Sequence, residues 1–251
     1  MNPPHFTSRS VLDGVLEREF TVDGVPGVLW SPADGSGRAP LVLMAHGGGT
    51  HKKHPAMSGR ARRLVAGCGC HVAVLDAPGH SGRPRTPHDE REIDLMMRTM
   101  AAGEPVGPVV VRYNGHLATR AVPEYRAALD ALQLLPEIGA DGPVGFFGLN
   151  MGTAIGLPLV AAEPRIGAAV LGQFWYDEAL AEQAGRITVP VEFAMQWDDE
   201  HIPRESGLAL FAALGSAEKS LHANSGGHKE LPRFEADSAV RFFARQFGTA
   251  V

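Results

Sequence analysis

The chain has few cysteines, no excess of basic residues and no long hydrophobic run. Only two of its 251 residues are cysteine, Cys68 and Cys70. A single residue separates them, which is ill suited to a disulfide, and two cysteines are too few for a metal site. We therefore expect both thiols to be reduced and structural, and we expect neither a metal nor a cofactor.

The charge balance also excludes some classes of partner. The sequence has 23 basic and 28 acidic residues, a formal net charge of −5. It therefore lacks the basic footprint that binds nucleic acid or an anionic membrane surface. No apolar run approaches the roughly 18 residues of a membrane span, and the first ten residues lack the apolar region of a signal peptide. We expect a cytoplasmic protein that binds neither nucleic acid nor membrane.

Apolar strands alternate with helix-length segments along most of the chain. Continuous apolar strands separated by helices are typical of a parallel sheet covered on both faces. A chain of this length suits one domain, so we expect a single α/β domain over residues 1–251. The strand candidates after the N-terminal region lie at 41–45, 72–75, 144–147, 168–171, 191–194 and 219–223.

Three further elements complete the predicted order. Residues 16–33 have the pattern of a β-hairpin with Asp23 and Gly24 at its turn. An amphipathic helix follows Pro123, which suits a first-turn position, and another helix closes the chain near 233–247. The segment 86–116 is predicted to be a small insertion or lid.

The segment 148–152 has the frame of a nucleophile elbow, Gly-x-Ser-x-Gly, but with Asn150 at its apex. Gly148 and Gly152 suit a strand-to-helix turn so tight that a β-carbon at either position would press on a neighbouring element. The apex usually has a positive φ, which asparagine tolerates better than most residues. Asparagine therefore suits the backbone conformation of the apex. It does not suit the role of nucleophile, because a neutral amide has no proton that a histidine can remove to make one.

Glycines also follow the first strand of the predicted parallel sheet, at Gly47, Gly48 and Gly49. Without side chains in the way, their backbone N–H groups can approach a developing oxyanion. The N–H of Met151, directly after the apex, is the expected second donor. Gly47, Gly48 and Met151 are therefore the predicted oxyanion hole.

An acid and a histidine follow in the order that this architecture requires. Asp198, Asp199 and Glu200 come after the strand at 191–194, where a carboxylate is well placed to orient a catalytic histidine. His228 comes after the strand candidate at 219–223. The order elbow, acid, histidine distinguishes this arrangement from other triad folds.

These motifs together resemble the α/β-hydrolase superfamily, and within it the small esterases similar to dienelactone hydrolases. The resemblance covers nearly the whole chain and includes the segment 76–80, Asp-Ala-Pro-Gly-His, after the second strand of the parallel series. It implies a mostly parallel, eight-stranded sheet with helices on both faces. It also implies a Ser-His-Asp mechanism on a small ester or lactone. In such relatives the acid commonly lies three residues before an Ile-Pro or Val-Pro pair, so Asp199 is chosen over Asp198.

Asn150 departs from that mechanism, and three explanations remain open. In the first, asparagine replaces the serine of an esterase and inactivates it. In the second, asparagine is the native residue of a non-hydrolytic enzyme or of a ligand-binding pseudoenzyme. In the third, it replaces an aspartate nucleophile. An aspartate nucleophile would resemble that of haloalkane dehalogenases and epoxide hydrolases. Those enzymes usually carry a His-Gly-x-Pro loop, which this sequence lacks. As written, the chain is predicted to have negligible ester turnover.

Several residues are predicted to line the substrate site. Phe174, Trp175 and Tyr176 follow the strand at 168–171 at its carboxyl end, the side where open α/β sheets bind ligands. A basic loop formed by His46, His51, Lys52, Lys53 and His54 is either a solvated loop or a site for a substrate carboxylate. No cysteine or carboxylate completes a metal site there. The sequence leaves the oligomeric state open.

Overall fold

The computed structural model describes residues 3–35 and 37–249. Its chain begins with a three-stranded antiparallel meander, β1 (His5–Leu12), β2 (Val15–Val22) and β3 (Val25–Pro32). The two turns are Asp-Gly pairs in which both residues have positive φ, as in a type I′ turn. The predicted hairpin with Asp23 and Gly24 at its turn is thus confirmed.

One sheet of nine strands organises the described residues, in the order β1-β2-β3-β5-β4-β6-β7-β8-β9. The strands from β5 to β9 are all parallel, and β3 pairs with β5 in the antiparallel sense. The predicted α/β class is confirmed, with nine strands in place of eight. The further strands are β4 (Leu41–Ala45), β5 (His71–Leu75), β6 (Val144–Gly148), β7 (Ile166–Gly172), β8 (Val191–Gln196) and β9 (Lys219–Asn224).

Strand β1 was not predicted, and its burial explains why. Its side chains are nearly all exposed, because it forms the outer edge of the meander and has no helix against it. Such a strand lacks the apolar alternation that marks a half-buried one.

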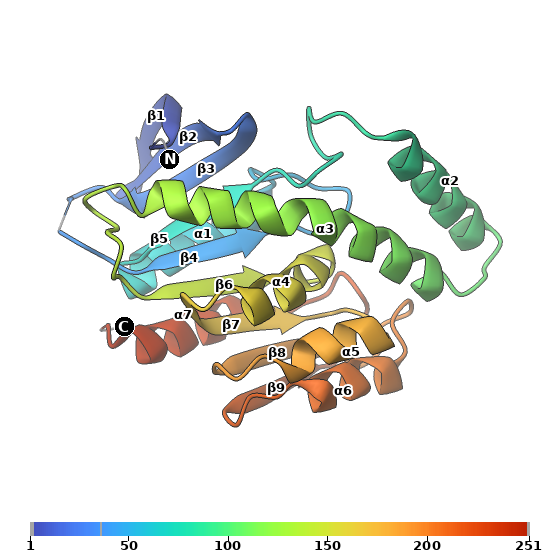
Figure 1. The fold of residues 1–251 in the computed structure, drawn as a ribbon. Coiled ribbons are helices and arrows are strands. Elements are labelled where there is room, and N and C mark those ends of the chain that lie inside the picture. Colours follow the sequence, from blue (N-terminus) through green and yellow to red (C-terminus); the bar gives the residue numbers. More distant parts are fainter. Residues whose placement is uncertain (1–2, 36, 250–251) are drawn as a thin grey trace.

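Helices cover both faces of the sheet (Figure 1). Buried side chains of α1 and α7 share one core cluster with the sheet, and those of α3, α4, α5 and α6 share the other. The helices are α1 (Pro55–Cys68), α2 (Pro87–Ala101), α3 (Gly107–Leu132), α4 (Met151–Ala162), α5 (Glu178–Gly185), α6 (Arg204–Ala213) and α7 (Phe234–Phe247). No helix in the described residues is long and apolar enough to cross a membrane.

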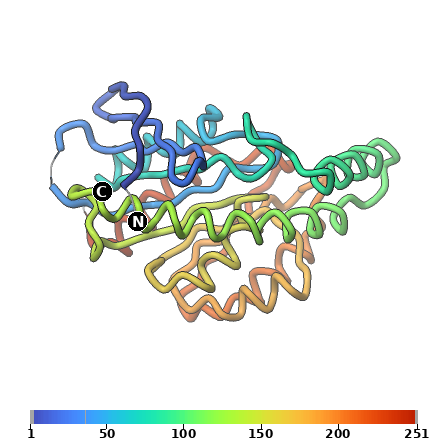
Figure 2. Tube along the Cα trace, turned by 45° about the horizontal axis from the view of Figure 1, so that its top comes forward, coloured from blue at the N-terminus to red at the C-terminus, as the bar shows by residue number. Residues whose placement is uncertain are grey.

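Helix α3 begins sixteen residues before Pro123, so the predicted first-turn position of this proline is wrong. Pro123 lies in the helix interior, where it removes one backbone hydrogen bond. Apolar burial on the sheet from Val109 to Leu132 outweighs that local cost. The segment 86–116 consists of α2 and the first turns of α3, which stand out at one end of the molecule (Figure 2).

Both cysteines are free thiols and both are buried, as the sequence predicted. Cys68 donates to the carbonyl of Val240 and Cys70 to that of Leu64. The two side chains therefore pack α1 against its neighbours.

Candidate active site

The sharp turn between β6 and α4 places Asn150 at φ 57° and ψ −124°. A β-carbon on Gly148 would lie 2.4 Å from the carbonyl oxygen of Gly152, and one on Gly152 would lie 2.7 Å from that of Ala45. Both contacts are with backbone, which cannot move aside as a flexible side chain could. The glycines are therefore required at the two positions that the sequence pattern indicated.

A continuous chain of hydrogen bonds joins Asn150, His228 and Asp199. The Nδ2 atom of Asn150 lies 2.6 Å from Nε2 of His228, and Nδ1 of His228 lies 2.8 Å from Oδ2 of Asp199. Because a carboxylate can only accept, His228 carries its proton on Nδ1 and accepts at Nε2 from the Asn150 amide. Three loops at the carboxyl ends of β6, β8 and β9 supply these residues.

Asp199 is held in its ionised form. Burial alone would raise the pKa of this carboxyl, because its side chain is only 3% exposed. Hydrogen bonds from His228 and from the backbone N–H groups of Ile202 and His201 outweigh burial, and the net pKa is lowered. The neighbouring Asp198 instead accepts from the N–H of Gly226 at 3.2 Å. The structure thus brings Asp199, and not Asp198, to the histidine.

The loop that carries His228 is fixed by further polar contacts. The backbone N–H of His228 donates to Oε2 of Glu200 at 2.8 Å, and its carbonyl accepts from Nε2 of Gln173 at 3.2 Å. Gly227 donates to Glu230 at 2.7 Å. Glu200 was one of three candidate acids in the sequence, and it contacts the backbone of His228, not its ring. The roles of Gln173 and Glu230 were not predicted, because support of this kind leaves no motif.

The glycine loop after β4 lies beside the turn at Asn150, since Ala45 of β4 pairs with Gly148 of β6. Nothing lies within 4 Å of a β-carbon built on Gly47 or Gly48, so no packing requirement explains these glycines. The carbonyl of Gly47 is held by Thr50 at 2.7 Å, which fixes the loop from its other side. The space above the loop is open to a ligand.

The backbone N–H of Met151 is occupied by its own neighbour. It donates to Oδ1 of Asn150 at 2.9 Å. The amide of Asn150 thus bonds at both ends, through Nδ2 to His228 and through Oδ1 to Met151. A ligand oxygen would have to displace Oδ1 to use this donor.

The structure corrects the substrate contact predicted for His46. Its side chain has no exposed surface; Nε2 accepts from the N–H of Ala77 at 3.0 Å, and Nδ1 lies 2.9 Å from the carbonyl of Gly47. Burial lowers the pKa of His46 to about 4, so the ring is neutral. His46 therefore supports the glycine loop from beneath.

The predicted aromatic wall is also placed differently. Phe174 has no exposed surface and Trp175 is 8% exposed; the two rings pack edge to face in the core. The substrate contact predicted for Phe174 is therefore corrected, because a long side chain after a parallel strand packs inward as readily as outward. Tyr176 alone of the three is substantially exposed.

The two lysines of the basic loop are neutralised within the chain. Lys52 lies 2.7 Å from Asp76, and Lys53 lies 2.9 Å from both Glu17 and Glu19. Because Lys52 and Lys53 already form these ion pairs, neither lysine is available for a substrate carboxylate.

The hollows that adjoin the site include two that the sequence did not indicate. One, of about 150 Å³, adjoins Asn150 and the glycine loop and is mostly apolar; its lining is Ala45, Gly47, Thr50, His54, Ala56, Met57, Arg60, Phe147, Leu149, Asn150 and Gln173. The other, of about 420 Å³, lies between the α2–α3 loop and His201. The His201 ring is 5.3 Å from the His228 ring, so this hollow ends near the histidine.

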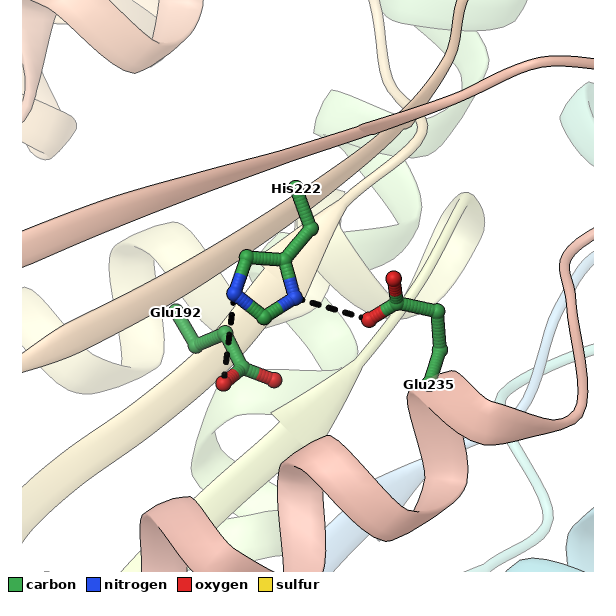
Figure 3. A group of neighbouring side chains, drawn as sticks. All are labelled: Glu192, His222 and Glu235. Carbon is green, nitrogen blue, oxygen red and sulfur yellow. Dashed lines mark hydrogen bonds and ion pairs between the residues drawn. The ribbon is translucent and has the colours of Figure 1, made fainter.

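One other cluster in the described residues combines ligand types that a metal accepts (Figure 3). His222 lies between two carboxylates, with Nδ1 2.8 Å from Glu235 and Nε2 3.7 Å from Glu192. Its two ring nitrogens face different carboxylates, as in an ion cluster, whereas a metal would need one nitrogen facing both. Burial raises the pKa of Glu192.

Comparison with known proteins identifies the fold. No family model and no curated protein sequence matches this chain. Among solved structures, a cold-adapted esterase from an Arctic intertidal metagenomic library is 33% identical, with a TM-score of 0.75 over 96% of this chain and 97% of the other. A zinc-bound structure of a cold-adapted esterase from such a library is 29% identical, with a TM-score of 0.72 over 96% and 99%. The acetyl xylan esterase 1 of a Thermoanaerobacterium species shares the fold at 16% identity, with a TM-score of 0.65 over 98% of this chain and 89% of the other.

The mostly parallel sheet with helices on both faces is that of these esterases. The chain belongs to the α/β-hydrolase family.

Proposed function

We propose that this chain is a carboxylesterase of the Ser-His-Asp type in which asparagine occupies the nucleophile position of the elbow. The observation that carries the proposal is the hydrogen-bond chain from Asn150 through His228 to Asp199. The similarity to a cold-adapted esterase at 33% identity supports ester hydrolysis as the reaction. The glycine loop favours acyl chemistry and agrees with a dienelactone-hydrolase-like subtype.

With serine at position 150, every step of the reaction has a residue to perform it. Nε2 of His228 would accept the hydroxyl proton as the oxygen attacks the ester carbonyl, and Asp199 would stabilise the imidazolium that forms. The resulting oxyanion would accept from the N–H groups of Met151 and the glycine loop. His228 would then protonate the leaving alcohol and later activate the water that releases the acyl group.

Asparagine removes two of these contributions at once. Its amide supplies no nucleophile, and its Oδ1 occupies the N–H of Met151. Loss of the nucleophile in a serine hydrolase lowers kcat by about 10⁶-fold, leaving about 10³–10⁴-fold over water from binding and the oxyanion hole. Because Oδ1 also competes for an oxyanion donor, we expect this chain to retain less than that residual.

The test is the hydrolysis of short-chain 4-nitrophenyl esters and small lactones by the chain as given and by Asn150→Ser. We expect Asn150→Ser to raise kcat/KM by several orders of magnitude, and His228→Ala in the serine variant to remove the gain. A serine variant that folds and stays silent on every substrate would refute the esterase proposal.

A second candidate is a native asparagine in a non-hydrolytic enzyme or a ligand-binding protein. The hydrogen bonds of the Asn150 amide favour this candidate, because Nδ2 bonds to His228 and Oδ1 accepts from Met151, so that both ends of the side chain have a partner. In a non-hydrolytic enzyme, His228→Ala or Asp199→Asn would destroy an activity that Asn150→Ser does not increase. In a pure binding protein, neither substitution would change any turnover.

We also propose that residues 1–251 form one domain with 86–116 as a small lid, and that the protein is cytoplasmic. The single sheet and its two core clusters support one domain. The α2–α3 loop borders the 420 Å³ hollow near His228, which supports a lid role for that segment. A small ester or lactone suits hollows of this size.

A further inference from the structure

An arginine side chain lines the small hollow beside Asn150, and no acidic side chain among the described residues pairs with it. Arg60 lies on the second turn of α1 and lines this 150 Å³ space together with the apolar side chains of Met57, Phe147 and Leu149. The same space is bordered by Gly47 and Asn150. Arg60 thus shares a cavity with the position where an acyl carbonyl would sit.

Arg60 differs from the other arginines of its helix. Arg62 pairs with Glu17 and Arg63 with Asp237. Arg60 forms no ion pair and no hydrogen bond with any residue in the described ranges, and its guanidinium lies 5.7 Å from the ring centre of Phe147. It is half-buried, and burial lowers the pKa of its guanidinium with no compensating partner.

A half-buried charge without a counter-ion is unfavourable, because it loses part of its hydration and gains no ion pair in return. Lys52 and Lys53, in the loop just before α1, are both paired. Of these three cationic side chains, Arg60 in the cavity is therefore the one without an ion-pair partner. An anionic group entering with the substrate would supply the missing partner, and a planar carboxylate matches the guanidinium fork.

The position of the histidine decides which half of the ester enters this cavity. His228 must protonate the leaving alcohol, so the alcohol lies on the histidine side of the site. The larger hollow reaches His201, whose ring packs against His228, whereas His228 does not line the Arg60 cavity. The Arg60 cavity is therefore on the acyl side.

We propose that Arg60 binds a carboxylate at the far end of the acyl group, so that the preferred substrates are monoesters of short dicarboxylic acids. This inference rests on the proposed esterase function. The apolar walls of the cavity take the methylene groups of such an acyl chain, and its small volume limits the chain to a few carbons. The carboxylate keeps its charge throughout, and only the ester bond is broken.

The test compares two 4-nitrophenyl esters of equal acyl length in the Asn150→Ser background, the glutarate monoester and the neutral pentanoate. Arg60→Met preserves much of the side-chain volume and removes the charge. We expect it to lower the ratio of kcat/KM for the charged ester to that for the neutral ester by about 10- to 100-fold, the range of a hydrogen bond to a charged group. Arg63→Met, which removes an exposed arginine from the same helix, should leave the ratio unchanged.

Folding gives an independent readout on Arg60→Met. Since Arg60→Met removes no ion pair or hydrogen bond among the described residues, and methionine can still pack on the Phe147 ring, the substitution should leave the melting temperature unchanged or raise it. A ratio of kcat/KM that Arg60→Met does not change would overturn the inference while leaving the esterase proposal intact.

A binding measurement separates the two proposals if Asn150→Ser hydrolyses neither ester. The chain as given is titrated by calorimetry with monomethyl glutarate and with dimethyl glutarate. Tighter binding of the monoanion, lost in Arg60→Met and kept in Arg63→Met, would support an anion subsite even though esterase function had failed. Equal binding of the two, or a preference that survives Arg60→Met, would overturn it.

Discussion

At the scale of single residues, the amide of Asn150 completes a network that a serine hydroxyl would use differently. The amide donates to His228 and accepts from Met151. A serine hydroxyl would donate to the same ring nitrogen and leave the Met151 N–H available. The asparagine therefore keeps the geometry of a catalytic site while removing its nucleophile and one of its oxyanion donors.

The choice between two adjacent acids can be tested directly. In the Asn150→Ser background we expect Asp199→Asn to lower kcat by about 10³–10⁴-fold, because a side-chain amide no longer fixes the tautomer or stabilises the imidazolium. Asp198→Asn is the matched control and should change kcat by less than about threefold, since Asp198 contacts Gly226 and Arg204 and does not contact the histidine. Ester kinetics over a range of substrate concentrations give both values. Equal losses in the two variants would contradict the assignment.

At the scale of elements, helix α2 is fastened at its first turn by one buried carboxylate. Asp89 has no exposed surface; it accepts from the backbone and hydroxyl of Thr86 in a capping box and pairs with Arg120 of α3. Burial would raise the pKa of Asp89, but the contacts with Arg120 and Thr86 outweigh it and lower the pKa to about 2. This carboxylate joins the proposed lid to the helix that packs on the sheet.

That pKa predicts how α2 responds to pH. A folded pKa of about 2, against an ordinary value of 3.8, stabilises α2 by about 2 kcal/mol. Because the folded pKa is depressed, this stability is present above about pH 4 and is lost as pH falls towards 2. We expect Asp89→Asn to speed amide hydrogen exchange in α2 near neutral pH, and the difference from the parent chain to disappear by about pH 2.

Glu90→Gln serves as the control on the same turn, since Glu90 is exposed and is not part of the capping box. Its exchange should match that of the parent. An Asp89→Asn chain whose α2 exchanges at the parental rate near neutral pH would show that the carboxylate does not fasten the helix.

At the scale of the whole molecule, the parts predicted from sequence are those with a strong local pattern. The buried parallel strands are continuous apolar runs, and Gly148 and Gly152 are required by backbone contacts that leave a recognisable frame. Strand β1 was not predicted because it is an exposed edge. The start of α3 was misplaced because tertiary burial overrides the local preference of Pro123.

In the site, too, the features with a local sequence pattern were predicted and those that depend on distant neighbours were not. Its hydrogen-bonded chain follows from the order of motifs, whereas the roles of His46 and Arg60 depend on neighbours that are distant in sequence. His46 is buried under Ala77 of another loop, and Arg60 faces Phe147 of β6. Periodicity along one helix or loop does not show which side chains fold over it.

The central claim is that position 150 lies where His228 activates a nucleophile. Intact-mass measurement after treatment with an alkyl fluorophosphonate, followed by peptide mapping, tests it most directly. We predict one covalent adduct at position 150 in Asn150→Ser, none in the chain as given, and strongly reduced labelling when His228→Ala is added. A folded Asn150→Ser chain that forms no adduct, or forms it equally well without His228, would contradict the account.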